Sequence, residues 1–285
     1  MKNIRLDNMI LEFKKDRAAA FSLCFLIIII LVSVFVVFLD IDPDSIDVAN
    51  MLQAPSEKYW FGTDEMGRDY FARVLYGGRI SLMVGVLAMI TSVIIGVVVG
   101  TAAGFYGGRT DNVLMRIVDV FSSIPWIIMV TVFALLFRKG LASIIFVIGL
   151  FSWMEIARLV RAETLSARER EYVRYAEFIG ASPLQIIITH IVPSVFPTII
   201  TAATAAVANA IMTESALSFL GIGIQQPMSS WGSLLQSSQQ YLQMAPYMAV
   251  LPGILIILTI YSFNKMGDAL RVFVEPRAAA GEKYE

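Results

Sequence analysis

Residue types that carry reactions are scarce in this sequence. Among 285 residues, His190 is the only histidine and Cys24 the only cysteine. Nucleophilic catalysis needs a base beside a serine or cysteine, and a zinc site needs several histidine or cysteine ligands. No Ser-His-Asp or Cys-His arrangement is evident, and the inventory excludes a disulfide within the chain and a histidine-rich metal site. Cys24 lies in an apolar segment, where we expect it to pack.

Nucleotide binding is not expected in this chain either. The sequence has no G-x-x-x-x-G-K-[ST] loop, whose backbone N–H groups and lysine would hold phosphates. If ATP powers the protein, a separate subunit must hydrolyse it. We therefore expect no cofactor and no metal in this chain, and no enzymatic activity of its own.

A few charged or aromatic residues in apolar surroundings have several interpretations. Glu214 could line a pore or attract a peptide amine, but its place near the outer end of an apolar segment favours a hydrogen-bonded structural role. Asp119 and Arg116 stand three residues apart, which predicts a local ion pair on one helix face rather than an ion pathway. Trp231 could shape an outer gate, meet a binding protein or anchor at the membrane interface, and the sequence leaves these open.

The most informative local pattern surrounds Gly180, between Glu171 and Pro193. An apolar-periodic helix is predicted to end at Gly180, because glycine adopts left-handed backbone angles without steric cost. A second helix is predicted to begin at once, with Ser182 as its N-cap, Pro183 in its first position and Gln185 completing a capping box. Apolar side chains on such an element would either dock in a groove of a partner or lie on the bilayer surface.

The elements that position these residues are membrane helices. The chain is 57% hydrophobic and 16% charged, too apolar for an ordinary water-facing surface. Crossing the hydrocarbon takes roughly 20 apolar residues. Six stretches meet or approach that length: Ala18 to Leu39, Ile80 to Phe105, about Leu114 to Phe137, Leu141 to about Arg158, about Ile191 to Leu220, and Met248 to Phe263.

The distribution of Lys and Arg predicts the orientation of these helices. Basic residues concentrate in the N-terminal segment, in the loops around Arg109 and Arg168, and after the last span, so both termini are predicted to be cytoplasmic. Because the basic residues set topology, no nucleic-acid partner is expected. No small-residue cleavage site follows the first span, which is interpreted as a retained anchor. Gly96, Gly100 and Gly104 form a four-residue ladder that predicts close helix packing.

The Gly180 loop resembles the cytoplasmic signature of ABC-importer permeases, in which EAA is followed by three residues, a Gly and, farther on, Leu-Pro. Ala176, Gly180 and Pro193 carry the match. The departures are Arg174 and Tyr175 in the EAA positions and Val192 in place of Leu. By this resemblance, the residues that would contact an ATPase are Arg174, Tyr175, Ala176, Gly180, Ala181, Ser182, Pro183 and Pro193.

Further motifs are similar to the second permease of dipeptide, oligopeptide and nickel importers. They read Phe61-Gly62-Thr63-Asp64, Gly67-Arg68-Asp69, Arg79-Ile80-Ser81, Tyr106-Gly107-Gly108-Arg109 with Asp111, Leu217 to Gly223, and Ser230-Trp231-Gly232. The resemblance implies an all-α, six-span, MetI-like type I permease in the cytoplasmic (inner) membrane. It divides the chain into an N-terminal helix and external segment (1–75), a permease core (76–275) with a coupling loop at about 160–193, and a cytoplasmic tail (276–285).

The same resemblance implies partners and a mechanism. The partners would be a second permease, two cytoplasmic ATPases that bind ATP and Mg, an extracytoplasmic solute-binding protein and the lipid bilayer. Closure of the ATPases would move the Gly180 loop as a lever and switch the pore between inward-open and outward-open states. Peptides are the expected substrate, with nickel or glutathione as alternatives. An ion-coupled carrier is a further alternative, but it would place several ionisable groups or broken half-helices near the midplane, and this sequence has few such groups. An intramembrane enzyme would need a catalytic pair facing a cavity, and the sequence supplies no obvious one.

Overall fold

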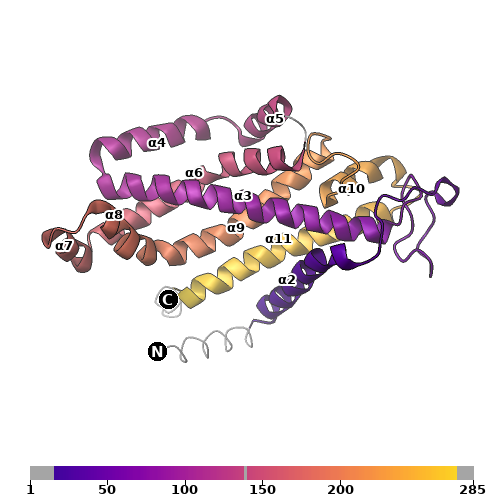
Figure 1. Cartoon of the computed structure of the whole chain (residues 1–285), viewed down its shortest axis with the longest axis horizontal. Coiled ribbons are helices and arrows are strands. Elements are labelled where there is room, and N and C mark those ends of the chain that lie inside the picture. Colours follow the sequence, from indigo (N-terminus) through magenta and orange to yellow (C-terminus); the bar gives the residue numbers. More distant parts are fainter. Residues whose placement is uncertain (1–15, 138–139, 275–285) are drawn as a thin grey trace, which may run out of the picture.

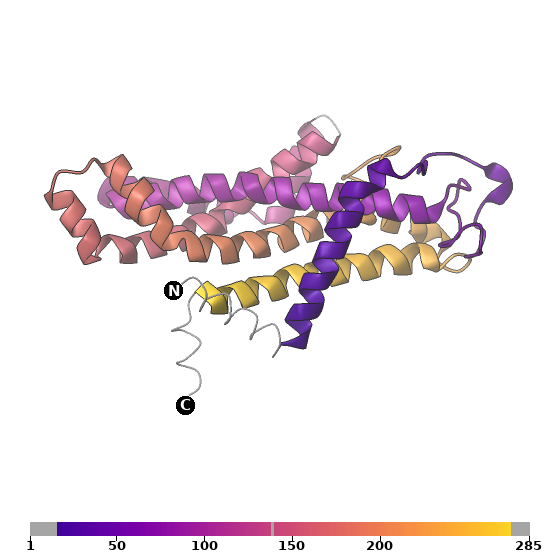
Figure 2. The same ribbon diagram turned by 60° about the horizontal axis from the view of Figure 1, so that its bottom comes forward.

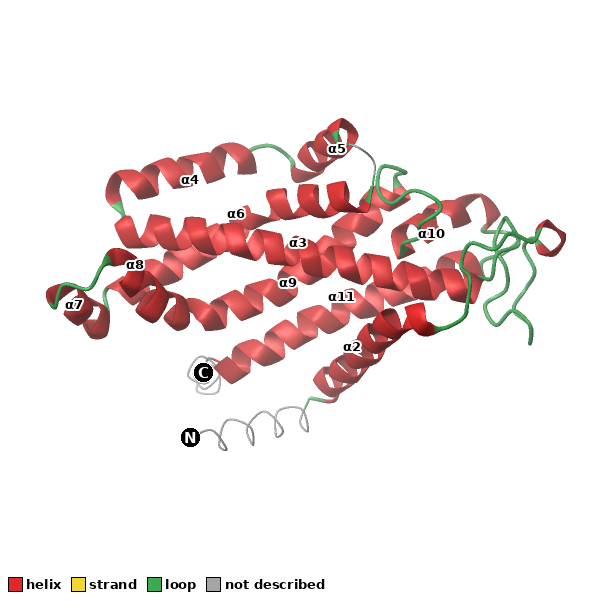
Figure 3. Ribbon diagram, in the orientation of Figure 1, coloured by secondary structure: helices red, strands yellow, loops and turns green. Residues whose placement is uncertain are grey.

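The computed structural model describes residues 16–137 and 140–274. Figure 3 shows that these residues form helices and loops, and no strand is present among them. The α-helices are α2 (Arg17–Phe35), α3 (Tyr70–Tyr106), α4 (Gly108–Ser122), α5 (Trp126–Leu136), α6 (Leu141–Arg168), α7 (Glu171–Phe178), α8 (Pro183–Ile186), α9 (Val192–Phe219), α10 (Trp231–Ser238) and α11 (Tyr247–Val274). Short 3-10 turns lie at Val36–Phe38, Val48–Asn50 and Gln239–Tyr241, and a π-turn at Ile187–Ile191 joins α8 to α9.

The helices form an elongated bundle with two different ends. Helices α3, α6, α9 and α11 run along the long axis, and α7 and α8 project at one end (Figure 1). Residues 36–69 and α10 lie at the opposite end. Helix α2 crosses α11 obliquely on one side of the bundle (Figure 2). We refer below to the α7 end and the α10 end.

Five helical segments of the described chain are long and apolar enough to cross a membrane: Arg17–Phe38, Tyr70–Tyr106, Leu141–Arg168, Pro183–Phe219 and Tyr247–Arg271. The α4–α5 pair would make a sixth span, but its two helices are bent by 83° at the break between them. The predicted third span, from about Leu114 to Phe137, is therefore not one straight helix but two helices that meet at a sharp bend. Pro125 explains the break, because proline lacks a backbone N–H and disfavours a helical conformation at Ile124.

Other predicted spans differ at their ends. Helix α3 begins at Tyr70 rather than Ile80, because the side chain of Asp69 caps it by accepting a hydrogen bond from the Phe71 N–H. With 37 residues it is about 55 Å long and exceeds the hydrocarbon thickness. Helix α6 continues to Arg168 instead of about Arg158, and α11 continues to Val274 instead of Phe263. In α6 and α11 the charged residues of the last turns end the apolar stretch, but the helix continues beyond that stretch.

The predicted glycine ladder brings α3 against α6. A Cβ atom on Gly96 would lie 2.7 Å from the Cβ of Ile156, one on Gly100 would lie 2.6 Å from the carbonyl oxygen of Ala157, and one on Gly104 would lie 2.7 Å from the Cβ of Thr164. The largest buried apolar cluster extends from this contact and includes Val84, Ala88, Val147, Ile148 and Ala210. The packing interpretation of the ladder is confirmed.

Substitution of this ladder should destabilise the bundle. Gly100→Ala places a methyl group against a backbone carbonyl, so α3 and α6 must separate, at a cost of about 1–3 kcal/mol. The matched control is Gly253→Ala in α11, where the nearest atom to an added Cβ is 4.0 Å away. We expect the control to be neutral or slightly stabilising, because alanine favours helices over glycine. Thermal unfolding of the two purified variants in detergent distinguishes them, and equal melting temperatures would contradict this packing.

An ion pair joins α2 to α11. Asp16 caps α2 by accepting hydrogen bonds from the Ala18 and Ala19 N–H groups, and it lies 2.7 Å from the Lys265 ammonium. The Lys265 hydrogen bond, followed by the Ala19 N–H, lowers the pKa of Asp16 below its usual value. Cys24 on the same helix, for which a packing role was expected, has an exposed side chain in this chain.

Candidate functional site

The loop between α7 and α8 has the backbone that the sequence predicted. Gly180 has a φ of +83°, and its N–H donates to the Glu177 carbonyl at 3.0 Å. The Ala181 N–H donates to the Ala176 carbonyl at 3.0 Å, so the last carbonyls of α7 are satisfied. Ser182 accepts from the Gln185 N–H at 3.4 Å and Pro183 begins α8. The cap at Ser182 is confirmed, but no reciprocal bond from the Gln185 side chain completes the predicted capping box.

One face of this loop is packed into the bundle. Val173, Ala176 and Ile186 are buried with Phe105 of α3 and Val160 of α6 in one apolar cluster. Ala176, which was predicted to contact an ATPase, is 4% exposed, so this chain itself covers most of its side chain. Its small size instead allows α7 to lie against the rest of the chain.

The opposite face of the loop is apolar and uncovered. Phe178 is 88% exposed, Leu184 65% and Ile179 62%, and all three flank Gly180. We call Phe178, Ile179 and Leu184 the loop tip. These three residues were not among the predicted contact residues. The sequence contained the signal for them, because three large apolar residues beside a predicted turn in a water-facing loop indicate a docking surface.

The other residues predicted for this surface lie around the loop tip. Tyr175 is exposed, and Arg174 forms an exposed ion pair with Glu169. Ser182 and Pro183 are exposed, Ala181 is half-buried, and Pro193 lies exposed in the first turn of α9. The structure therefore brings most of the predicted residues to one projection, with Ala176 as their buried support.

A second ion pair fixes the helix that carries this projection. Arg161 on α6 contacts both carboxylate oxygens of Asp111 on α4, with Nη2 to Oδ2 at 2.6 Å. Asp119 pairs with Arg158 on α6 at 3.0 Å, so the predicted pair of Asp119 with Arg116 is wrong. Asp119 therefore pairs with Arg158 on the neighbouring helix α6 and not with Arg116, which lies one turn away on its own helix.

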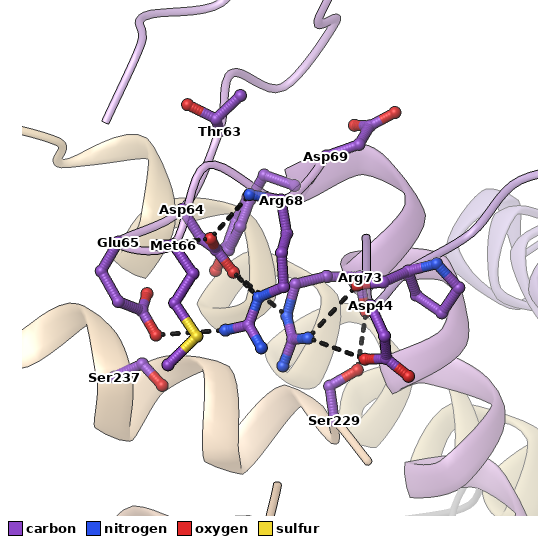
Figure 4. A network of polar contacts seen from close by, with 12 residues as sticks. Asp44, Thr63, Asp64, Glu65, Met66, Arg68, Asp69, Arg73, Ser229 and Ser237 are labelled. Atoms are coloured by element: carbon purple, nitrogen blue, oxygen red, sulfur yellow. Dashed lines mark hydrogen bonds and ion pairs between the residues drawn. The ribbon is translucent and has the colours of Figure 1, made fainter. Parts of the chain in front are cut away.

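At the α10 end, charged side chains form a buried network (Figure 4). The Asp64 carboxylate lies 2.6 Å from the Arg68 Nε and 3.4 Å from the Arg73 Nε. Arg68 also pairs with Glu65 at 3.2 Å, and Arg73 pairs with Asp44 at 3.2 Å. Both guanidinium groups are almost fully buried. The network ties residues 44–69 to the start of α3.

Glu214 and Trp231 are both buried inside the chain, with 0% exposure. The Ser81 and Ser218 hydroxyls donate to the Glu214 carboxyl group at 3.0 and 2.6 Å. The Trp231 indole N–H donates to the Val74 carbonyl at 3.1 Å, and its ring covers Gly78. These contacts agree with a structural role for Glu214. Both side chains are covered by this chain itself, so neither lies at a surface where a pore, a gate or the membrane interface would contact it.

Within the described residues, no group of three or more His, Cys, Asp and Glu side chains is placed to hold a metal ion. Two features stand out in the described residues: several helices that are long and apolar enough to cross a membrane, and a projecting helix–glycine–helix element with an apolar tip. These features together indicate a polytopic membrane protein that carries an exposed apolar projection at one end.

Comparison with known proteins gives the particular family. Residues 92–280 match the model of the binding-protein-dependent transport system inner membrane component, and residues 6–55 match that of the N-terminal TM domain of oligopeptide transport permease C. The chain belongs to the binding-protein-dependent transport system inner membrane component family. It is a permease subunit of an ABC importer and a multi-pass protein of the cytoplasmic membrane.

Similar proteins agree with this assignment over nearly the whole chain. The oligopeptide transport system permease protein OppC of Bacillus subtilis is 36% identical, covering 94% of this chain and 88% of that protein. OppC of Escherichia coli is 38% identical, covering 93% of this chain and 89% of that protein. In a solved structure of the inward-facing MetNI methionine ABC transporter, one chain matches with a TM-score of 0.57 at 20% identity, covering 70% of this chain and 97% of that one, so the MetI-like fold is shared.

Proposed function

We propose that this chain is the second permease subunit of an importer that moves di- or oligopeptides inward, driven by separate ATPase subunits. The observation that carries the proposal is the loop tip, where Phe178, Ile179 and Leu184 are exposed on a base that is firmly buried. Such a surface fits a cleft in a partner. The names of the relatives support peptides as the cargo.

The α7 end is proposed to face the cytoplasm. Arg158, Arg161 and Arg168 on α6, Arg170 between the helices and Arg174 on α7 all lie toward that end, as the positive-inside rule requires. Both termini would then be cytoplasmic, with six spans if α4 and α5 together count as one. The division into an N-terminal anchor with external segment (1–75), a permease core (76–275) and a tail (276–285) is part of this proposal.

The proposed partners follow from the same arrangement. Two ATPases bind ATP and Mg below the membrane, a second permease completes the pore, and a solute-binding protein delivers peptide at the α10 end. No nucleotide, metal or nucleic acid is proposed to bind this chain. Movement of the loop tip would be transmitted along α6, a helix of 28 residues that ends next to α7. The ion pair between Arg161 and Asp111 would transmit the movement from α6 to α4.

Reconstitution tests the proposed transport. The complex, purified with its ATPases and second permease, is placed in proteoliposomes with its binding protein, and uptake of labelled peptides of two to five residues is measured with and without ATP. We expect ATP-dependent peptide accumulation. ATP-dependent uptake of nickel or glutathione, with no peptide uptake, would overturn the peptide assignment and leave the importer assignment standing.

Gly180 should be required for coupling rather than for assembly. Gly180→Val forces a β-branched residue into left-handed backbone angles, which costs about 1–2 kcal/mol and reorients the loop tip. We expect a loss of ATP-driven transport of about tenfold or more at normal protein level, and a smaller loss for Gly180→Asn, because asparagine tolerates these angles.

Gly108→Val is the matched control for Gly180→Val. Gly108 also has a positive φ, +51°, and no atom within 4 Å of an added Cβ, but it lies at the start of α4. Transport and membrane protein level are measured for all three variants. Equal losses at Gly108 and Gly180, or loss of the protein itself in Gly180→Val, would identify Gly180 as an ordinary helix terminator.

A further inference from the structure

Glu214 is an acidic group buried without a cationic partner. It lies in α9 with 0% exposure, and none of the ion pairs within the described residues includes it. An isolated buried carboxyl group is costly unless hydrogen bonds compensate it. The hydrogen-bond partners of the Glu214 carboxyl group therefore indicate the role of this residue.

Two hydrogen-bond chains reach Glu214 from the same external segment. The Trp231 backbone N–H donates to the Ser81 hydroxyl at 3.2 Å, and Ser81 donates to Glu214 Oε2 at 3.0 Å. The Ile224 backbone N–H donates to the Ser218 hydroxyl at 3.0 Å, and Ser218 donates to Glu214 Oε1 at 2.6 Å. Each serine hydroxyl thus accepts from the segment and donates to the carboxyl group.

The first chain ends at a helix N-terminus. Ser230 caps α10, and Trp231 is the first residue of that helix. Its N–H has no partner within the helix and lies at the positive end of the α10 dipole. Glu214, through Ser81, therefore satisfies one N–H group at the N-terminus of α10.

Close packing reinforces both chains. A Cβ atom on Gly232 would lie 2.5 Å from the Ser215 Cα, and one on Gly223 would lie 2.6 Å from the Ser218 Cα. A Cβ on Gly78 would lie 2.7 Å from the Trp231 ring. The segment from Ile222 to Ser238 is thus in close contact with α9 at Gly223 and Gly232, and with α3 at Gly78.

We propose that Glu214 is a positioning residue that anchors the external segment Ile222–Ser238 to α3 and α9. During transport, α10 then moves with these two helices as one rigid body instead of opening as a separate lid. The carboxyl group contacts neither cargo nor nucleotide. It acts through Ser81 and Ser218, and this anchoring role accounts for the presence of an acidic residue within an apolar helix.

Hydrogen–deuterium exchange of the assembled complex in lipid nanodiscs tests the anchor. In Glu214→Leu, peptides that contain Ile224 and Trp231 should exchange at least tenfold faster than in the unmodified protein, while peptides from α6 stay unchanged. Ser218→Ala should accelerate only the Ile224 peptide and Ser81→Ala only the Trp231 peptide. Glu214→Gln, whose amide can still bond to the serines, should stay within threefold of the unmodified protein.

Ser237→Ala is the matched control, because this hydroxyl on α10 donates to the Ser233 carbonyl of its own helix. It should leave exchange unchanged. If Glu214→Leu fails to fold, the two serine variants decide the result. Unchanged exchange of the Ile224 and Trp231 peptides in both serine variants would overturn the anchor.

A second comparison tests the rigid-body movement and rests on the proposed function. Exchange of the same two peptides is measured with the complex free of nucleotide and with it held by a non-hydrolysable ATP analogue. We expect rates within twofold. A tenfold increase in either state would show that α10 opens as a lid. If no ATPase assembles with the chain, the proposed function fails while the variant series still measures the anchor.

Discussion

Phe178→Ala is expected to abolish most ATP-driven transport while leaving the permease folded and in the membrane. Phe178 is 88% exposed and contributes to no buried cluster, so its removal should not weaken the bundle. Aromatic anchors at the centre of a protein interface typically contribute about 2–4 kcal/mol. That range predicts a loss of roughly 30-fold or more in affinity between permease and ATPase, measured by co-purification and by peptide uptake.

Phe21→Ala is the matched control for Phe178→Ala. Phe21 is also exposed, but it lies on α2 within a candidate membrane span. We expect it to retain transport and ATPase binding. Full transport by the Phe178 variant would show that the loop tip does not dock on the ATPases, and loss of the protein from the membrane would show that Phe178 has a folding role.

Asp64→Asn should cause the largest loss of stability at the α10 end. Asp64 is the carboxylate that lies between two buried guanidinium groups, those of Arg68 and Arg73. Its neutralisation leaves Arg68 with Glu65 alone and Arg73 with Asp44 alone. Removal of one partner from a buried ion pair costs about 3–5 kcal/mol. We expect a fall in the melting temperature of the purified complex and faster proteolysis of residues 40–69.

Asp40→Asn provides the comparison for Asp64→Asn. Asp40 is an exposed acid of the same external segment, and no ion pair of the described residues includes it. Its neutralisation should change the melting temperature little, since exposed charges contribute little to stability. Equal effects of the two substitutions would mean that net charge, and not the buried network, stabilises this end.

Features set by neighbouring residues were predictable from the sequence. The left-handed Gly180, the Ser182 cap and Pro183 follow from local backbone sterics, and the structure confirms each. The glycine ladder of α3 was also predictable, because a stripe of small residues requires a close neighbour, although the sequence does not name α6 as that neighbour.

Features that depend on distant contacts were not predictable. Arg73 would ordinarily mark the end of an apolar span, but here partners on residues 44–69 allow it to be buried inside α3. Trp231 resembles an interfacial anchor until α3, more than 150 positions earlier in the chain, provides Gly78 and the Val74 carbonyl as its pocket. The same holds for Asp119, whose partner Arg158 lies 39 positions away.

The most direct measurement is affinity purification of the tagged full-length chain from its native cell in mild detergent, followed by mass spectrometry and an ATPase assay. The account predicts that a second permease and two ATP-hydrolysing subunits co-purify, and that Phe178→Ala releases the ATPases but keeps the second permease. A chain that purifies without any ATPase and transports its cargo in liposomes without ATP would contradict the account and identify an ion-coupled carrier.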